Sequence, residues 1–189
     1  YQNPKFPISC ISVWDNFSKE VKTFFLPEYE SEKDLLLAFS AHVKKTAPDL
    51  LSGWNAVEFD WKYIYARWKY LFGQKHYSIA KAMSPVGEES FSSKDEETEN
   101  MTFNPIGISI VDFMAWHKKI TLNKESSYTL DYTAEKNLGI GKRHKKVNFN
   151  SLDETVKLRN REDVELLAKL EDKFHYIDYH DELRRLSKC

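Results

Sequence analysis

The order of strand-like and helical segments at the start of the chain is the feature that most limits its fold. β-branched and aromatic runs at 8–15 and 21–26 flank the polar turn DNFSKE, which predicts an antiparallel hairpin. A helix is predicted next, because Ser31 can act as its N-cap and apolar residues then follow at helical spacing as far as Val43. The chain therefore opens with two strands and a helix.

A second step from strand to helix follows. The segment DLLSGWN, bounded by Pro48 and Gly53, is typical of a buried strand that enters a sheet after a crossover helix. From Asp60 the apolar residues repeat every three or four positions as far as Leu71, which predicts another helix. Asp60 is thus predicted to lie at a strand-to-helix junction. Strands and helices that alternate after a hairpin predict an α/β fold, a mixed sheet flanked by helices.

The remaining segments are predicted from composition and periodicity. The acidic, weakly hydrophobic residues 85–104 predict a mobile loop, too polar for a hairpin. A strand-like run returns at 107–116, and 128–146 reads as a helix ended by two glycines and followed by a basic cluster. One long helix is predicted over 161–187, with an apolar face that begins at Asp163.

Composition narrows the class of protein. A chain of 189 residues, 41% of them hydrophobic, can bury one core and is expected to form a single domain. Lys and Arg number 28 against 29 Asp and Glu, so the net charge of −1 gives no overall attraction to DNA or an anionic membrane. No apolar run approaches the roughly 20 residues of a membrane span. Cys10 and Cys189 lack metal-site spacing and suit a reducing cytoplasm.

Asp60 and Asp163 are the candidate metal ligands. In a sheet covered by helices, carboxylates at strand ends or helix starts converge at one edge, where hard divalent cations bind oxygen ligands. Two such ions, about 3.5 to 4 Å apart, can activate a water molecule and stabilise the leaving oxygen of a phosphodiester. The alternative is that each aspartate caps a helix or complements its dipole. Spacing alone leaves that alternative open.

A resemblance to a known family adds to this reading. The segment LLSGWNAVEFDWKYIYARWKYLFG resembles the second exonuclease motif of family B DNA polymerases, with Asn55, Phe59 and Asp60 in its N-x(2 to 4)-[FY]-D pattern. GISIVDFMAWHKKI, SSYTLDYTAEKNLGIGK and DVELLAKLEDKFHYID resemble later blocks of the same domain, in the same order. Residues 1–189 are therefore identified as a phage-type exonuclease domain, a fragment of a longer polymerase.

The resemblance implies both a fold and a reaction. The fold would be ribonuclease H-like, and the activity would be 3′–5′ proofreading, in which two divalent ions, Mg or Mn, serve hydrolysis of the terminal phosphodiester of a single-stranded DNA 3′ end. Asp60 and Asp163 would be the catalytic metal ligands, and Asn55 and Phe59 would hold the terminal nucleotide. The expected partners are the remaining polymerase domains, and the expected location is the cytoplasm of a bacterial or phage-infected cell.

The chain departs from the family pattern at two places. The third motif is usually Y-N-x-x-D-V, whereas this chain has RNREDV, so Arg159 replaces a tyrosine that helps to position the attacking water. The first motif, D-x-E, is expected just before YQNPKFP and is absent, so the fold is expected to lack its first strand and hydrolysis to be impaired. The alternative function is a non-catalytic exonuclease-fold module that binds DNA or another polymerase domain.

The sequence also suggests roles for several other polar residues. Asp15 is expected to be a hairpin turn residue and not a substitute metal ligand. Asp112 either caps the end of its strand or approaches the site. The basic run after the predicted helix could contact the DNA backbone, or it could form a solvated face. Its members are Lys142, Arg143, Lys145 and Lys146.

Overall fold

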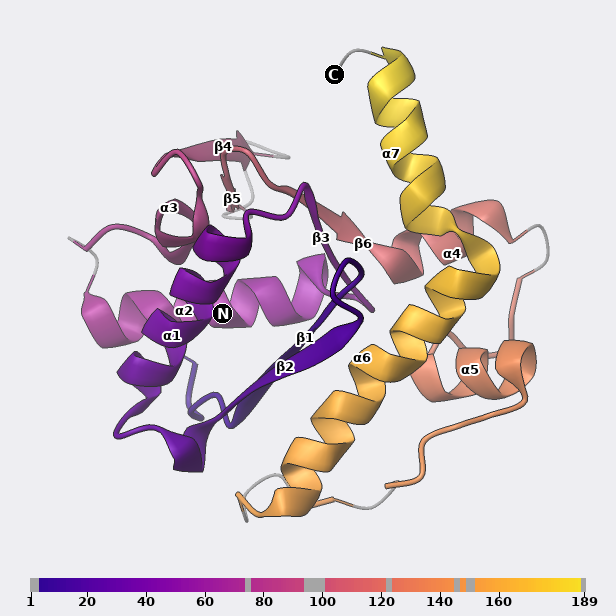
Figure 1. Ribbon diagram of the computed structural model, residues 1–189, viewed down its shortest axis with the longest axis horizontal. Coiled ribbons are helices and arrows are strands. Elements are labelled where there is room, and N and C mark those ends of the chain that lie inside the picture. The colour runs from indigo at the N-terminus through magenta and orange to yellow at the C-terminus, as the bar shows by residue number, and fades with distance from the viewer. Residues whose placement is uncertain are drawn as a thin grey trace. The chain divides into compact units, whose positions relative to one another are not determined.

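The structure is a computed structural model that describes residues 4–73, 76–93, 101–121, 124–144, 147–148 and 152–187. Helices and strands follow one another along these residues in mixed order, which confirms the predicted α/β class (Figure 1). The chain forms two compact units. The first comprises residues 1–9, 24–51 and 56–111, and the second comprises residues 10–23, 52–55 and 112–189.

The predicted hairpin is present. Strands β1 (Cys10–Asp15) and β2 (Glu20–Phe25) pair with each other across a short turn. In that turn the carboxylate of Asp15 accepts hydrogen bonds from the backbone N–H groups of Phe17, at 2.8 Å, and Ser18, at 3.4 Å. Asp15 therefore acts as the turn residue that was predicted.

The first long helix also follows its sequence signals. A 3₁₀ turn (Leu26–Glu28) leads into α1 (Glu32–Thr46), whose N-cap Ser31 accepts a hydrogen bond from the backbone N–H of Asp34 at 3.3 Å. The helix ends at Ala47, which takes the left-handed conformation with φ of 42°. The cap and the stop are both local, which is why the sequence predicts them.

The segment after α1 forms the predicted junction. Strand β3 (Leu50–Gly53) is followed by a π-helical turn (Val57–Trp61) and by α2 (Lys62–Phe72). The short helix α3 (Ile79–Met83) comes next, and it packs against α1 and α2 within the first unit (Figure 1).

A buried ion pair holds residues 4–8 in the first unit. Arg67 of α2 donates from Nε to Oε1 of Glu32 at 2.8 Å, and the same oxygen accepts the backbone N–H of Ile8 at 2.8 Å. Arg67 also donates from Nη1 to the carbonyl oxygen of Pro4 at 3.0 Å. The hydrogen bond to Glu32 raises the pKa of Arg67, so the guanidinium stays charged although it is buried.

The acidic segment contains a hairpin that the sequence analysis did not predict. Strands β4 (Glu89–Ser93) and β5 (Met101–Pro105) pair antiparallel, with Glu89 opposite Pro105 and Ser93 opposite Met101. The expectation of a loop over 85–104 was therefore wrong for the two strands, because the acidic residues are concentrated between them, at 94–100, outside the described residues. The mobility of the segment stays a prediction.

The strands are arranged differently from the single mixed sheet that was predicted. Among the described residues they form three two-stranded sheets, β1 with β2, β3 with β6 (Ser109–Asp112), and β4 with β5. Strands β3 and β6 have four residues each, so each presents few backbone groups to a further strand. Helix α4 (Phe113–Ile120) starts directly after β6, and α5 (Leu130–Leu138) ends at Gly139 as predicted.

Two helices close the chain in place of the single helix predicted over 161–187. Helix α6 (Glu154–Phe174) starts earlier than predicted, because the carboxylate of Asp153 accepts the backbone N–H of Thr155 at 2.9 Å. His175, in the left-handed conformation with φ of 53°, separates α6 from α7 (Tyr176–Ser187). Within the second unit α6 packs against β1 and α5 (Figure 1).

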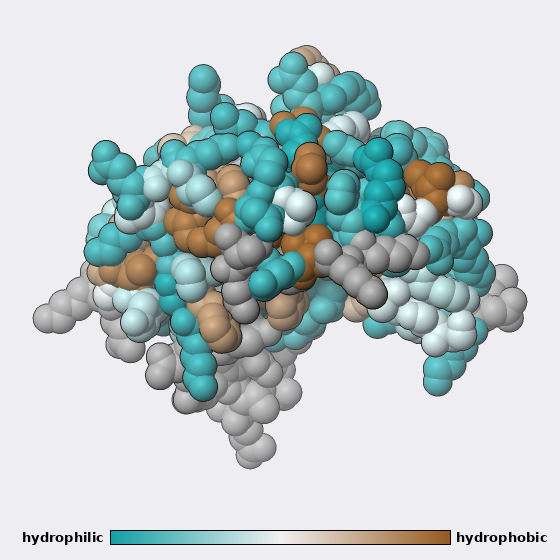
Figure 2. All heavy atoms as spheres, turned by 90° about the horizontal axis from the view of Figure 1, so that it is seen from below, coloured by the Kyte–Doolittle hydropathy of each residue, from teal (hydrophilic) through white to brown (hydrophobic). Residues whose placement is uncertain are grey.

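The second unit has its own apolar core, and its buried members are Phe113, Leu130, Leu170 and Tyr176. Trp54 and Trp116 pack against this core, whereas Trp61 and Trp68 are buried in the first unit. The face drawn in Figure 2 is mostly hydrophilic, with hydrophobic residues in separate patches. In the part of the chain that the structure describes, no helix is long and apolar enough to cross a membrane.

Candidate active site

Asp60 lies on the π-helical turn between β3 and α2. The backbone N–H of Trp61 donates to the carbonyl oxygen of Ala56 at 2.7 Å, five residues earlier, which is the bond that defines this wide turn. Trp61 is buried, at 7% exposure, whereas Asp60 beside it is exposed. The buried indole anchors the turn, and the neighbouring carboxylate is left at the surface. Single π turns inside helices are frequent at functional sites.

The helix-cap alternative for Asp60 does not match this geometry. The N-cap of the π turn is Ala56 and that of α2 is Trp61, and neither makes a side-chain cap hydrogen bond. Asp60 lies inside the helical segment, where its charge still complements the positive end of the helix dipole. Asp60 is therefore a first-turn carboxylate and not an N-cap.

Asn55 and Phe59 occupy the same motif. Asn55 has a φ of 59°, the left-handed region that asparagine tolerates better than most residues, so its identity suits the turn where the chain leaves β3. The ring of Phe59 is 54% exposed. An exposed ring next to an exposed carboxylate can stack on a base while the carboxylate faces the adjoining phosphate.

Asp163 lies inside α6 and does not begin a helix. Its side chain is 37% exposed, and its Oδ1 atom faces two cations. Lys142 Nζ is 2.7 Å from that oxygen, and Nη1 of Arg159, one helical turn earlier, donates a hydrogen bond to it. Both cationic side chains are mostly buried, at 13% and 14% exposure. The third-motif carboxylate is thus neutralised within the protein.

Two carboxylates hold the loop that carries Lys142. The backbone N–H of Lys142 donates to Oδ1 of Asp131 on α5 at 2.6 Å. The next two backbone N–H groups, of Arg143 and His144, donate to the two oxygens of Glu162 on α6, at 3.0 and 3.2 Å. Three successive amides are therefore fixed to the helices, and the loop places the ammonium of Lys142 against Asp163.

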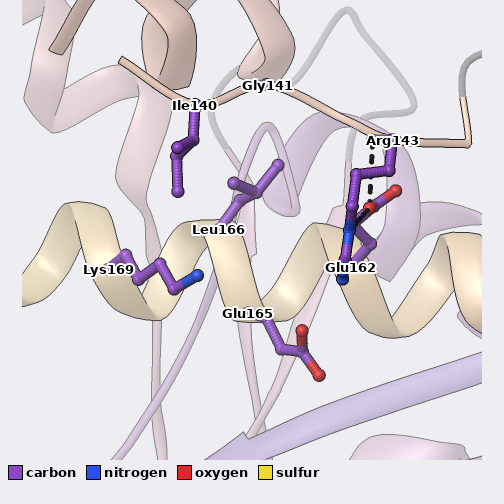
Figure 3. A pocket seen from close by; sticks show the side chains of 7 residues that line it. All are labelled: Ile140, Gly141, Arg143, Glu162, Glu165, Leu166 and Lys169. Atoms are coloured by element: carbon purple, nitrogen blue, oxygen red, sulfur yellow. Dashed lines mark hydrogen bonds and ion pairs between the residues drawn. The ribbon is translucent and has the colours of Figure 1, made fainter. Parts of the chain in front are cut away.

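Glu162 is the more deeply buried of these anchors, at 5% exposure. Burial by itself would raise its pKa, but hydrogen bonds from the side chain and backbone of Arg143 and from His144 lower the pKa to about 2. Figure 3 shows Glu162 beside Arg143 at a pocket of about 350 Å³ between this loop and α6. Other residues that line it are Ile140, Gly141, Glu165, Leu166 and Lys169.

The glycine that precedes Lys142 lies close to two side chains of α5. A Cβ atom at Gly141 would lie 2.5 Å from Oε1 of Glu135 and 2.9 Å from Oδ1 of Asp131. A larger residue at this position would therefore require these two side chains to move.

The predicted DNA-contacting cations have different surroundings. Lys142 pairs with Asp163, and Arg143, although its side chain is 79% exposed, pairs with Glu162. Lys145 and Lys146 lie outside the described residues. The internal ion pairs leave Lys142 less available to a phosphate than the sequence analysis supposed.

Asp112 has a structural role. Its carboxylate accepts the backbone N–H of Ala115 at 2.9 Å and so forms the N-cap of α4. The cap belongs to the helix that follows, and not to the end of the strand as the sequence analysis had it.

The predicted metal ligands fit a divalent ion unequally. Carboxylate oxygens are the donors that Mg and Mn prefer, and the exposed carboxylate of Asp60 meets that requirement. Asp163 does not fit as it stands, because two cations already face its Oδ1. Over the described ranges, no group of three or more His, Cys, Asp or Glu side chains is arranged to hold a metal. Asp60 belongs to the first unit and Asp163 to the second, and their sharing of a metal stays a prediction.

Comparison with known protein families shows to which family the chain belongs. The family described as DNA polymerase family B, exonuclease domain, matches residues 2–133. This chain belongs to the exonuclease-domain family of the family B DNA polymerases. The matched region includes the turn that carries Asp60. Asp163 lies beyond this region, and its assignment as a metal ligand rests on the resemblance of RNREDV to the third motif.

The curated relatives of this exonuclease domain include viral DNA polymerases. It is 32% identical to the DNA-directed DNA polymerase of Escherichia phage RB69 over 128 residues, 64% of the chain and 13% of the relative. It is 26% identical to the DNA-directed DNA polymerase of Enterobacteria phage T4 over 166 residues, which are 83% of the chain and 18% of the relative. The DNA polymerase catalytic subunit of Gallid herpesvirus 2 is 30% identical over 133 residues, 66% of the chain and 10% of the relative. The chain thus matches less than a fifth of each relative's length.

Proposed function

We propose that this exonuclease domain removes nucleotides from the 3′ end of a single DNA strand, as the proofreading part of a longer DNA polymerase. The observation that carries the proposal is the exposed Asp60 on its π turn, next to the exposed ring of Phe59, inside the region that matches the family. The ring would stack on the terminal base, and the carboxylate would face the scissile phosphodiester. Asn55, at the start of the turn, would help to hold the terminal nucleotide.

The divalent ions, Mg or Mn, would supply an activated water and stabilise the leaving oxygen when bound. Asp60 is the residue here that suits them, whereas Lys142 and Arg159 at Oδ1 of Asp163 oppose a metal ion there. Hydrolysis by this chain is therefore expected to be weak. Lys145 and Lys146, with Arg143, would contact the DNA backbone. The proposed setting is the cytoplasm of a bacterial or phage-infected cell.

The second candidate function is a non-catalytic module of the exonuclease fold that binds DNA or another polymerase domain. The pairing of Asp163 with Arg159 favours it, because a carboxylate that is neutralised within the protein has less need of a metal. The two candidates share DNA as a partner and differ in whether the strand is cut.

The test uses the full natural gene product that contains these 189 residues. A 5′-labelled primer annealed to a template is supplied in Mg buffer with either a paired or a mismatched 3′ terminus. Proofreading predicts shortening from the 3′ end, faster for the mismatched primer. Binding of both primers without shortening would support the non-catalytic module instead.

A further inference from the structure

We propose that Arg159 is a resident cation that competes with a divalent metal ion for Asp163. The proposal rests on the proposed function, because it takes Asp163 to be a metal ligand, and it names the residue that controls the site. Arg159 and Asp163 lie one turn apart on α6, the spacing at which helical side chains meet.

The electrostatics of the contact support competition. Nη1 of Arg159 and Nζ of Lys142 both face Oδ1 of Asp163, so two positive charges surround one carboxylate oxygen. A divalent ion that approached this oxygen would meet repulsion from both, and the partial burial of the two side chains limits screening by solvent. Metal binding at Asp163 is therefore expected to be weak while both cations stay in place.

Of the two cations, Arg159 is the one carried by the same helix as Asp163, one turn away. The loop of Lys142 is held by its own backbone N–H on Asp131 and by the two following amides on Glu162. A change of rotamer at Arg159 breaks its ion pair without any movement of the backbone, and its substitution leaves the anchors of that loop intact. Arg159 thus sets how readily Asp163 accepts a metal.

The experiment is a calorimetric titration of MnCl₂ into the 189-residue chain and its variants. Arg159→Gln keeps the polarity of the side chain and removes its charge, and we expect it to tighten Mn binding about tenfold, the loss of one charge-assisted hydrogen bond. Asp163→Asn in the Arg159→Gln background should abolish the gain. Arg159→Met, an apolar straight-chain helix former, is the second variant in case the first does not fold, as judged by circular dichroism.

Arg161→Gln is the matched control. It removes the same charge from the same helix, but Arg161 pairs with Glu165, at 4.0 Å, and not with Asp163. Its affinity for Mn should equal that of the wild type. An equal gain in Arg161→Gln would show that only overall charge matters, and it would overturn the proposal.

Failure of this inference can be told apart from failure of the proposed function. If the Arg159 variants fold and bind Mn no better than the wild type, Arg159 is not the competitor. Primer shortening that depends on Asp60 would then still support the exonuclease, whereas its absence would remove both.

Discussion

Replacing Glu162 with glutamine tests how the loop that carries Lys142 is held. The carboxylate of Glu162 accepts two backbone N–H groups and, at 2.9 Å, the Nε–H of Arg143. A glutamine has one acceptor oxygen and one NH₂ donor, so at least one of these backbone N–H groups would lose its acceptor. Glu162→Gln should therefore loosen the loop and destabilise the second unit.

The size of the destabilisation by Glu162→Gln follows from the pKa of Glu162. The pKa of Glu162 falls from 4.5, its ordinary value, to about 2 in the folded protein, and this difference corresponds to about 3 kcal/mol. Because the folded-state pKa is the lower one, the stabilisation is complete above pH 4.5 and is lost as the pH falls towards 2. The wild type should exceed Glu162→Gln by about 3 kcal/mol at pH 7, and the gap should shrink below about pH 5.

The assay is urea unfolding followed by circular dichroism at several pH values between 7 and 3. Glu165→Gln is the matched control, because Glu165 is 38% exposed and its ion pair with Arg161 spans 4.0 Å. The control should lose less than about 0.5 kcal/mol at any pH. A gap between wild type and Glu162→Gln that stays constant from pH 7 to pH 3 would refute the reasoning.

Three further substitutions have defined expectations. Arg67→Ala leaves Glu32 buried without its cation and should cost about 3 to 5 kcal/mol in urea unfolding; a loss below about 1 kcal/mol would mean that the pair is hydrated. Asp112→Ala removes the N-cap of α4 and should lower the free energy of unfolding by about 0.5 to 2 kcal/mol, while primer shortening by the folded protein stays unchanged. Gly139→Ala should cost about 1 kcal/mol, because φ is 70° while no atom lies within 4 Å of the added Cβ; an unchanged melting temperature would count against strain at this position.

The parts of the fold that could be predicted are those with local signals. The cap at Ser31 and the Asp15 turn each depend on residues within three positions, and the sequence alone predicts both. The break at His175 could not be found in this way, because Leu170, Phe174 and Ile177 keep a helical spacing across it. Periodicity reports which face is buried and does not report a single left-handed residue.

In the candidate site too, only the features with local sequence signals could be predicted. Asp60 was placed at its junction by the strand and helix patterns around it, although the π turn itself left no readable signal. Arg159 and Asp163 stand four positions apart in a helix, so their ion pair could have been predicted from spacing. Lys142 lies on a different segment, and its contact with Asp163 depends on how α5, the loop and α6 pack.

Asp60→Ala tests most directly whether Asp60 serves catalysis and not the fold. The full natural gene product that contains these residues would be compared with the variant in thermal unfolding and in Mg-dependent digestion of a labelled single strand. We predict that Asp60→Ala abolishes digestion and shifts the melting temperature little, because the side chain is exposed. A variant that is destabilised by about 0.5 to 2 kcal/mol, as a lost cap would be, and that still digests the strand would contradict the catalytic role of Asp60.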